Sequence, residues 1–486
     1  MSDNLQLLSK LEPQPLWRYF GEICSIPHCS KQEDKLRSWL KLQAEELKLP
    51  WREDSVGNIV ISRPATAGME NSPGIILQSH MDMVCEKNSG SSHDFTTDPL
   101  ELKVEGNILT ACDTTLGADN GVGAASALAL LADNSFPAGP LQALFTVDEE
   151  TGLTGAQALE PGFISGDYLL NLDSEESWVL CIGCAGGKDS ELTPHLSFKP
   201  GQTSSALRLT VDGLFGGHSG VDIHTGRGNS VKILTDLLSE LGEVMNWQLV
   251  NFEGGTKHNA IPRSATSLLI VDDFVQAVTV IENAFQQHQE IYKQRDSALC
   301  LQIDQLETDL PRANFADSRQ LVGLLTSLPH GVMEMSAAIE GLVETSSNLA
   351  IVSLSAEQQE ILMSHRSSCA ASLARLATRT REIARAFGVD ITQGNGYPGW
   401  QPNPDSPLLA RSLELYRDLF DDEPEVLSIH AGLECGLIGA RFPELDMIAI
   451  GPTIRNPHTP DELVEIDSVE RYWQFLCRLV EKLGSV

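Results

Sequence analysis

Two histidines and several carboxylates occupy five short segments that are scattered over most of the chain. Each segment places a histidine or an acid where a short apolar run ends or a helix begins. The segments are 78–82, 117–121, 148–150, 171–173 and 457–460. Together they supply two imidazoles, three carboxylates and a spare acid, which is the ligand set that two metal ions need to activate one water molecule. The chemistry that these residues favour is metal-assisted hydrolysis.

The first histidine of the set, His80, has a carboxylate close by in the sequence. A lone histidine is more often a hydrogen-bonded core residue than a metal ligand. Asp82, however, stands two residues further on, so it lies on the same side of an extended segment. It can accept the second ring N–H of His80 and leave the other nitrogen for a metal. The pair predicts a ligand, His80, oriented by Asp82.

The number of acids fits a pair of divalent ions. Two zinc ions carry four positive charges, and the candidate ligands Asp119, Glu150 and Asp173 with a bridging hydroxide balance them. Without metal these acids would repel one another and be costly to bury. Glu149 is left over beside a ligand, which favours it as the general base that takes a proton from the water and passes it to the leaving amine. An exposed acid is the ordinary state of a glutamate, and we expect that state for Asp148.

The elements that must position these residues follow from short apolar runs. Strands buried on both faces are predicted at 59–61, 75–77, 144–147 and 168–170. Between them we predict a helix that Ser30 caps and an Ala/Leu-rich helix at 122–131. This order predicts a mostly parallel sheet with helices on both sides, in which ligands gather at the carboxyl ends of the strands. His80, Glu149 and Asp173 each follow a predicted strand, and this agreement in position favours a functional site.

The chain changes character near residue 190. We predict that residues 1–190 form the first part of an α/β catalytic domain and that residues 191–392 form an inserted α+β domain with long helices. Residues 393–486 would complete the catalytic domain. Expected helices lie near 229–241, 273–293, 367–387 and 467–483, and an expected late strand lies at 447–450.

Composition excludes several classes of function. The 486 residues carry a net charge of −33, which disfavours binding to nucleic acid or to anionic lipid. No apolar run is long enough for a membrane span, and the N-terminus lacks a secretory signal, so we expect a cytoplasmic protein. Ten cysteines are too few for a disulfide scaffold, and we interpret Cys181 and Cys184 as reduced structural thiols.

Several stretches that metal binding does not require resemble a known family. The chain is similar over nearly its whole length to the aminoacyl-histidine dipeptidases (Xaa-His dipeptidase, peptidase D). These belong to a di-zinc exopeptidase superfamily that includes aminoacylase and carnosinase. Besides the five segments above, the resemblance rests on residues 114–121, 216–220, 259–262, 397–402 and 430–436.

The resemblance implies how the metal ligands divide. Asp119 would bridge two Zn²⁺ per chain, with His80 and Asp173 completing one site and Glu150 and His458 the other. Co²⁺ or Mn²⁺ could occupy the same nitrogen and oxygen ligands. The peptide bond that follows the bridging aspartate would be cis.

The resemblance also implies roles for the inserted domain as a lid and a dimer contact. His218 would reach a neighbouring active site and polarise the scissile carbonyl, assisted by Asn259. Arg366 would bind the free carboxylate of the substrate, although His365 stands before it where we expect an apolar residue in the family. By charge alone, Glu434 is a candidate for the substrate's α-ammonium. Without the resemblance, His218 could be a turn residue and Arg366 a surface or strand-pairing residue.

The favoured hypothesis is a cytosolic homodimer that hydrolyses unblocked dipeptides. A C-terminal histidine would be preferred, and carnosine-like β-alanyl dipeptides are candidate substrates. One alternative is an N-acyl-amino-acid amidohydrolase of the same superfamily, which an N-acetylated substrate would distinguish. The other is a non-catalytic metal-binding scaffold, against which the presence of Glu149 argues.

Overall fold

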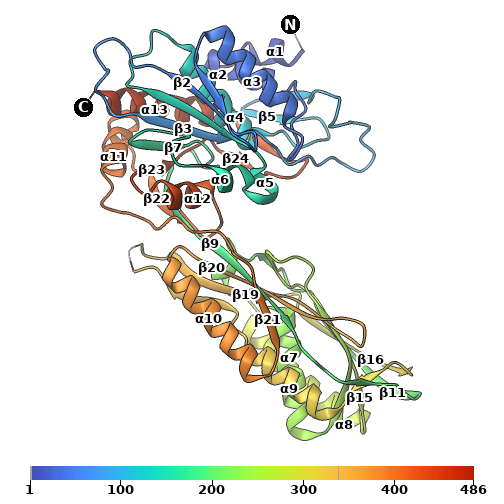
Figure 1. Cartoon of the computed structure of the whole chain (residues 1–486). Coiled ribbons are helices and arrows are strands. Elements are labelled where there is room, and N and C mark those ends of the chain that lie inside the picture. The colour runs from blue at the N-terminus through green and yellow to red at the C-terminus, as the bar shows by residue number, and fades with distance from the viewer. Residues whose placement is uncertain (1–2, 338, 486) are drawn as a thin grey trace. The chain divides into compact units, whose positions relative to one another are not determined.

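The computed structural model describes residues 3–337 and 339–485, and the chain divides into two units (Figure 1). The first comprises the chain up to Gly183, Pro402–Ser428 and the chain from Leu433 onward, and the second comprises Cys184–Gln401 and Ile429–Gly432. The second unit therefore interrupts the first in sequence. Its main segment begins before residue 191 and ends after residue 392, because strand β9 (Gly186–Thr193), which crosses the first predicted boundary, and strand β21 (Asp390–Gln393), which crosses the second, both belong to its sheet.

The first unit is built on an eight-stranded sheet of order β1-β2-β6-β3-β7-β23-β8-β22. The strands are β1 Trp51–Glu53, β2 Ile59–Arg63, β3 Ile75–His80, β6 Leu141–Thr146, β7 Tyr168–Asn171, β8 Val179–Cys184, β22 Glu425–Ile429 and β23 Asp446–Ala449. Strand β3 pairs in parallel with β6 and β7, and β7 pairs in parallel with β23. Towards one edge, β1, β2 and β6 pair antiparallel. The predicted α/β class is confirmed, and the sheet is mixed, with its parallel part in the centre, β6-β3-β7-β23, because β8 also pairs antiparallel with β23.

The first unit also contains helices, some of which contact this sheet. They are α1 Asp3–Leu8, α2 Gln14–Ile23, α3 Asp34–Leu47, α4 Ala118–Ala132, α5 Glu149–Gly152, α6 Thr154–Ala158, α11 Pro407–Phe420, α12 Glu434–Arg441 and α13 Ile466–Gly484. Helix α4 contacts both β3 and α2, and almost all of its residues are buried, as its run of alanine and leucine predicts. Helix α3 begins at Asp34 and not near Ser30, because the Ser30 hydroxyl donates to Asp82.

A small four-stranded sheet of order β24-β25-β5-β4 completes the first unit. Its strands are β4 Leu102–Glu105, β5 Ile108–Ala111, β24 Ile454–Arg455 and β25 Leu463–Glu465. Strands β24 and β25 pair antiparallel, so residues 456–462 form the loop between them. Strand β25 also pairs with β5, which precedes the segment leading to α4.

The second unit is an antiparallel sheet of order β16-β11-β15-β13-β19-β20-β9-β21, with β18 paired to β19. Its strands are β9 Gly186–Thr193, β11 Ser204–Asp212, β13 Trp247–Gly254, β15 Ala265–Val271, β16 Cys300–Thr308, β18 Gly331–Met335, β19 Val343–Leu354, β20 Gln359–Ser367 and β21 Asp390–Gln393. The short pairs are β10 Phe198–Lys199 with β17 Arg312–Ala313, and β12 Gly217–His218 with β14 Ala260–Ile261.

Among the described residues of the second unit, four α-helices and one 3₁₀ helix occur besides this sheet. They are η1 Ile223–Thr225, α7 Ser230–Val244, α8 Phe274–Tyr292, α9 Phe315–Ser327 and α10 Ala370–Ala386. Leucines of α7 and α9 share one hydrophobic core with residues of the central strands. The predicted long helices near 229, 273 and 367 are confirmed, and α9 was not predicted.

The cysteines differ in part from expectation. Cys29 and Cys85 form a disulfide, although the sequence indicated no disulfide scaffold. Cys181 and Cys184 are buried thiols, as predicted. Within residues 3–337 and 339–485, no helix combines the length and the apolar character that a bilayer crossing needs.

Candidate metal centre

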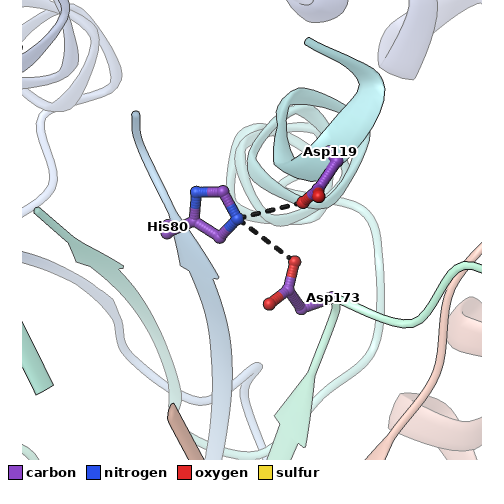
Figure 2. A group of neighbouring side chains, drawn as sticks. All are labelled: His80, Asp119 and Asp173. Atoms are coloured by element: carbon purple, nitrogen blue, oxygen red, sulfur yellow. Dashed lines mark hydrogen bonds and ion pairs between the residues drawn. The ribbon is translucent and has the colours of Figure 1, made fainter. Parts of the chain in front are cut away.

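Asp119 lies between two histidines that are far apart in the sequence. Its Oδ1 is 3.0 Å from Nε2 of His80, and its Oδ2 is 3.2 Å from Nε2 of His458. Asp173 Oδ1 approaches the same nitrogen of His80 at 3.3 Å, as Figure 2 shows. Glu150 Oε2 approaches Nε2 of His458 at 2.9 Å. The two oxygens of one carboxylate thus face two different ligand groups.

The sheet explains why these residues meet. His80 is the last residue of β3, and Asp173 follows the end of the neighbouring parallel strand β7. Parallel neighbours end at the same edge, so the two side chains project into the same space. Asp119 comes from the first turn of α4, where its own backbone angles and those of Asn120 are not helical. The expected cis peptide bond between these two residues is confirmed.

The donor set fits divalent metal ions. Three groups of imidazole nitrogens and carboxylate oxygens have their ligand atoms within 4.8 Å of one another. They are His80, Asp119 and Asp173; His80, Glu149 and Glu150; and Asp119, Glu150 and His458. Among the described residues, the buried Oε1 of Glu150 has no hydrogen-bond partner. Crowded acids with an unpartnered buried oxygen are suited to zinc, cobalt or manganese, whose charge would offset their repulsion.

Asp82 supports more of the centre than the sequence indicated. Its carboxylate lies 3.4 Å from Nδ1 of His80, and its main-chain oxygen accepts from the same nitrogen at 3.0 Å. The carboxylate also accepts the backbone N–H of Glu149 at 3.0 Å and that of Glu150 at 3.3 Å. Ser30 donates its hydroxyl to it at 2.7 Å. Burial opposes the charge, but these donors, with His80, lower the pKa of Asp82 to about 2.

The acids that follow β6 differ in their surroundings. Asp148 is buried and not solvated, which corrects the expectation, because its positive φ turns the side chain inward to accept from the hydroxyls of Thr151 and Thr154. The Glu149 carboxylate makes no hydrogen bond to any described residue. Burial raises the pKa of Glu149 well above its ordinary value; His80 opposes this shift, and other acids of the centre add to it.

The second unit contains a cluster of residues around His218. His218 lies on β12, opposite Ala260 of β14, and the backbone oxygen of Asn259 accepts from Ser219 at 2.8 Å. Nδ1 of His218 accepts the backbone N–H groups of Gly220 and Val221, at 3.3 and 3.1 Å. Burial, followed by the charge of Arg366, lowers the pKa of His218 to about 4. The ring is therefore neutral near pH 7, and Nε2 carries its proton.

Arg366 lies on β20 between Ser346 of β19 and Gly187 of β9. It is 6% exposed, and its Nη1 donates to the hydroxyl of Tyr397 at 3.4 Å. Its Nε is buried and has no partner, and no carboxylate of the described residues forms an ion pair with it. His365, whose presence the sequence left unexplained, is fully buried, with its ring nitrogens each 3.0 Å from a serine hydroxyl.

The carboxylate of Glu434 is not exposed to solvent. Its side chain is 0% exposed and accepts from Nε2 of Gln78 at 2.5 Å and from the hydroxyl of Thr146 at 2.7 Å. These partners belong to β3 and β6, inside the sheet that carries the centre. Burial raises the pKa of Glu434 to about 7. The position favours a supporting role over the predicted contact with a substrate ammonium.

Glu462 is a buried acid that the sequence reasoning missed. It is 2% exposed and accepts from the backbone N–H groups of residues 116–119. The one available signal was its place four residues after His458, but its partners lie more than three hundred residues away.

Comparison with known proteins decides the family. Residues 76–482 match the model of Peptidase family M20/M25/M40. The chain belongs to this peptidase family. It is therefore a hydrolase of peptide bonds.

Two relatives are similar over almost the whole chain. The cytosol non-specific dipeptidase of Escherichia coli (strain K12) is 41% identical over 98% of this chain and 99% of its own length. The crystal structure of aminoacylhistidine dipeptidase from Vibrio alginolyticus superposes with a TM-score of 0.90 and 39% identity, covering 98% of each chain. A tripeptidase from Staphylococcus aureus shares the fold, with a TM-score of 0.58 at 15% identity over 98% of this chain and 100% of its own.

Proposed function

We propose that the protein hydrolyses unblocked dipeptides at a centre of two divalent ions, with zinc as the first candidate. The observation that carries the proposal is Asp119, whose two oxygens each face a different histidine. His80 and Asp173 complete one group, and Glu150 and His458 complete the other. The family and the names of both close relatives support peptide-bond hydrolysis of this kind.

The metal ions and the side chains of the protein would have different roles in the reaction. When bound, the two ions would supply the positive charge that lowers the pKa of a shared water. Glu149 would take a proton from that water, whose oxygen bonds to the carbonyl carbon as the C–N bond breaks, and would return the proton to the leaving nitrogen. The Glu149 carboxylate has no competing hydrogen bond to a described residue, and Asp82 fixes the backbone of Glu149.

His218 is proposed to polarise the scissile carbonyl in a neighbouring subunit of a homodimer. Its Nδ1 is occupied by two backbone N–H groups, so Nε2–H is the donor that remains. A neutral imidazole that donates a hydrogen bond can stabilise charge developing on an oxygen without losing its own proton. Asn259, held beside it by the β12–β14 pair, would assist.

Arg366 is proposed to bind the free carboxylate of the dipeptide. A buried guanidinium without a carboxylate partner is costly, and a substrate carboxylate would remove that cost. The name of the Vibrio relative supports a preference for a C-terminal histidine, with carnosine-like substrates as candidates. The name of the Escherichia coli relative supports a wider range of dipeptides and a cytoplasmic location.

The test is Glu149→Gln, measured with a panel of free dipeptides that includes a Xaa-His dipeptide and carnosine. We expect kcat to fall about 10²- to 10⁴-fold, because a general base is lost, while metal content stays at the wild-type level. Glu160→Gln, an exposed acid of the same unit, is the matched control and should retain full activity. Normal turnover by Glu149→Gln would contradict the mechanism.

The same panel separates the alternatives. N-acetylated dipeptides should not be cleaved by a dipeptidase and would be cleaved by an N-acyl-amino-acid amidohydrolase. A metal-binding scaffold would bind the ions and cleave neither class.

A further inference from the structure

The loop that carries His458 is exposed where it meets the metal centre. The His458 side chain is 49% exposed and its φ is 64°, within the loop 456–462 between β24 and β25. Exposed loops are the mobile parts of a fold, so a ligand on such a loop needs an anchor to keep its position. Only residues 459–461 separate His458 from the buried end of the same loop.

Glu462 is that buried end, and both of its carboxylate oxygens accept hydrogen bonds from the backbone of residues 116–119. Its Oε2 accepts the backbone N–H groups of Leu116 and Gly117 at 2.8 and 3.0 Å. Its Oε1 accepts those of Ala118 and Asp119 at 2.8 and 3.3 Å. Four consecutive N–H groups at the start of a helix form a concave site for an anion, and here the chain's own carboxylate fills it.

The backbone conformation of residues 116–119 allows one carboxylate to accept all four N–H groups. Gly117 has a φ of 68°, which points successive N–H groups to the same side, and a Cβ there would lie 2.9 Å from the sulfur of Met83. The last N–H of the four belongs to Asp119, whose Oδ2 faces His458. One loop therefore contacts Asp119 twice, through its backbone with Glu462 and through its side chain with His458.

We propose that Glu462 is a positioning residue that holds the His458 loop against the Asp119 turn. It thereby sets the spacing of the ligands in the group of Asp119, Glu150 and His458. The inference rests on the proposed two-metal function and deepens it, because it names the residue that keeps one of the two sites assembled.

A carboxylate is needed in this position because the site offers four donors and no acceptor. Glu462→Gln keeps the shape but turns an amide N–H₂ towards two backbone N–H groups, which would leave them unsatisfied. Glu462→Asp keeps the charge but is shorter by one methylene, so it cannot reach all four donors at once. We expect the glutamine variant to be affected more than the aspartate variant.

The experiment titrates zinc into metal-free protein against a chromophoric chelator and measures kcat and KM with a free dipeptide. In Glu462→Gln, we expect one zinc to keep its affinity within about threefold and the other to bind about 10- to 100-fold more weakly. The rate constant kcat should fall while KM changes by less than about threefold. Glu462→Asp should lie between this variant and the wild type.

Asp54→Asn is the matched control. Asp54 also accepts three consecutive backbone N–H groups in a turn of the first unit, but no predicted metal ligand lies in that turn. The Asp54→Asn substitution should lower the thermal stability of the protein without changing the affinity of either zinc site. The proposal is overturned if Glu462→Gln binds both zinc ions as the wild type does, or if both affinities fall equally. It is also overturned if neither Glu462 variant folds while Asp54→Asn does.

A wild-type chain that binds fewer than two zinc ions, or that cleaves no dipeptide, would instead contradict the proposed function. The two failures are distinguishable. Failure of the Glu462 proposal is measured in the variants, whereas failure of the proposed function is measured in the wild type alone.

Discussion

Arg366 is a single residue whose surroundings define what it can bind. Its guanidinium is buried, donates to the Tyr397 hydroxyl at 3.4 Å and forms no ion pair with an acid of the described residues. A permanent charge in that state favours an anionic ligand of matching fork geometry. The residue therefore supplies a specific test of the proposed substrate class.

Arg366→Lys should raise KM for free dipeptides about 10- to 100-fold, because a bidentate charged contact is worth about 1.5–3 kcal/mol. The corresponding dipeptide amides, which lack the carboxylate, should be cleaved by the variant and by the wild type with similar KM. Arg375→Lys, an exposed arginine of the same unit, is the control. An equal rise in KM for acids and amides would contradict carboxylate binding.

The sequence was sufficient to predict where some individual residues lie and insufficient for others. His80 and Asp173 were predictable because each follows an apolar run that ends at the same edge of a sheet. Asp148 was not, because its burial depends on a positive φ and on two threonine hydroxyls that no local pattern indicates. Glu462 was missed for a related reason, since all of its partners are backbone groups of a distant segment.

At the scale of elements, Asp82 joins the end of β3 to the N-terminus of α5. The same carboxylate contacts His80 and the backbone of Glu149 and Glu150, so it couples a ligand on one element to the base on another. Short apolar runs predicted strands β2, β3, β6, β7 and β23, and apolar periodicity predicted most of the long helices. The start of α3 was not, because Ser30 is engaged by Asp82 and does not cap a helix.

Asp82→Asn should lower both zinc affinity and kcat, each by about 10- to 100-fold, because a residue that supports metal ligands is lost. An amide nitrogen turned towards the N–H of Glu149 would also displace the base. Zinc titration and steady-state kinetics measure the two effects. Asp94→Asn, on an exposed loop, is the control, and unchanged zinc affinity in Asp82→Asn would contradict the assignment.

His365 gives the strand pair β19–β20 a dependence on pH. Burial lowers its pKa to about 4, whereas an unfolded histidine titrates near 6.5. The unfolded chain thus binds the extra proton first, so the free energy of unfolding should fall as pH drops from about 7 to about 4 and change no further below that. The contribution is at most about 3 kcal/mol for one such group.

Denaturant midpoints at several pH values between 7 and 4 measure how the free energy of unfolding depends on pH. The His365 ring contacts the hydroxyls of Ser190 and Ser347. His365→Gln, which can still bond to both, should flatten the dependence on pH. His195→Gln, whose ring is 58% exposed, should not. An unchanged slope in His365→Gln would show that other groups cause the acid sensitivity.

At the scale of the whole molecule, the five proposed ligands all belong to the first unit. Metal should therefore stabilise that unit by mass action and leave the second unit unaffected. With free zinc at about a hundred times its dissociation constant, the gain is about 2.7 kcal/mol for each site. The division into two units was indicated by the change of sequence texture. The return of Ile429–Gly432 was not, because four residues carry no such signal.

Chelation should lower the melting temperature of one calorimetric transition and leave the other in place. Addition of zinc should restore the original profile, which separates metal loss from irreversible unfolding. Equal displacement of both transitions would contradict ligands confined to one unit.

The disulfide between Cys29 and Cys85 does not act alone. Met83 donates its N–H to the oxygen of His28 at 3.2 Å, and Ser30 donates its N–H to the oxygen of Met83 at 3.3 Å, so main-chain pairing already joins the two segments. In a reducing compartment, where such a covalent link would be opened, this pairing would still present the Ser30 hydroxyl to Asp82. Dithiothreitol should therefore leave turnover intact, and the crosslink would serve only as reinforcement under oxidising conditions.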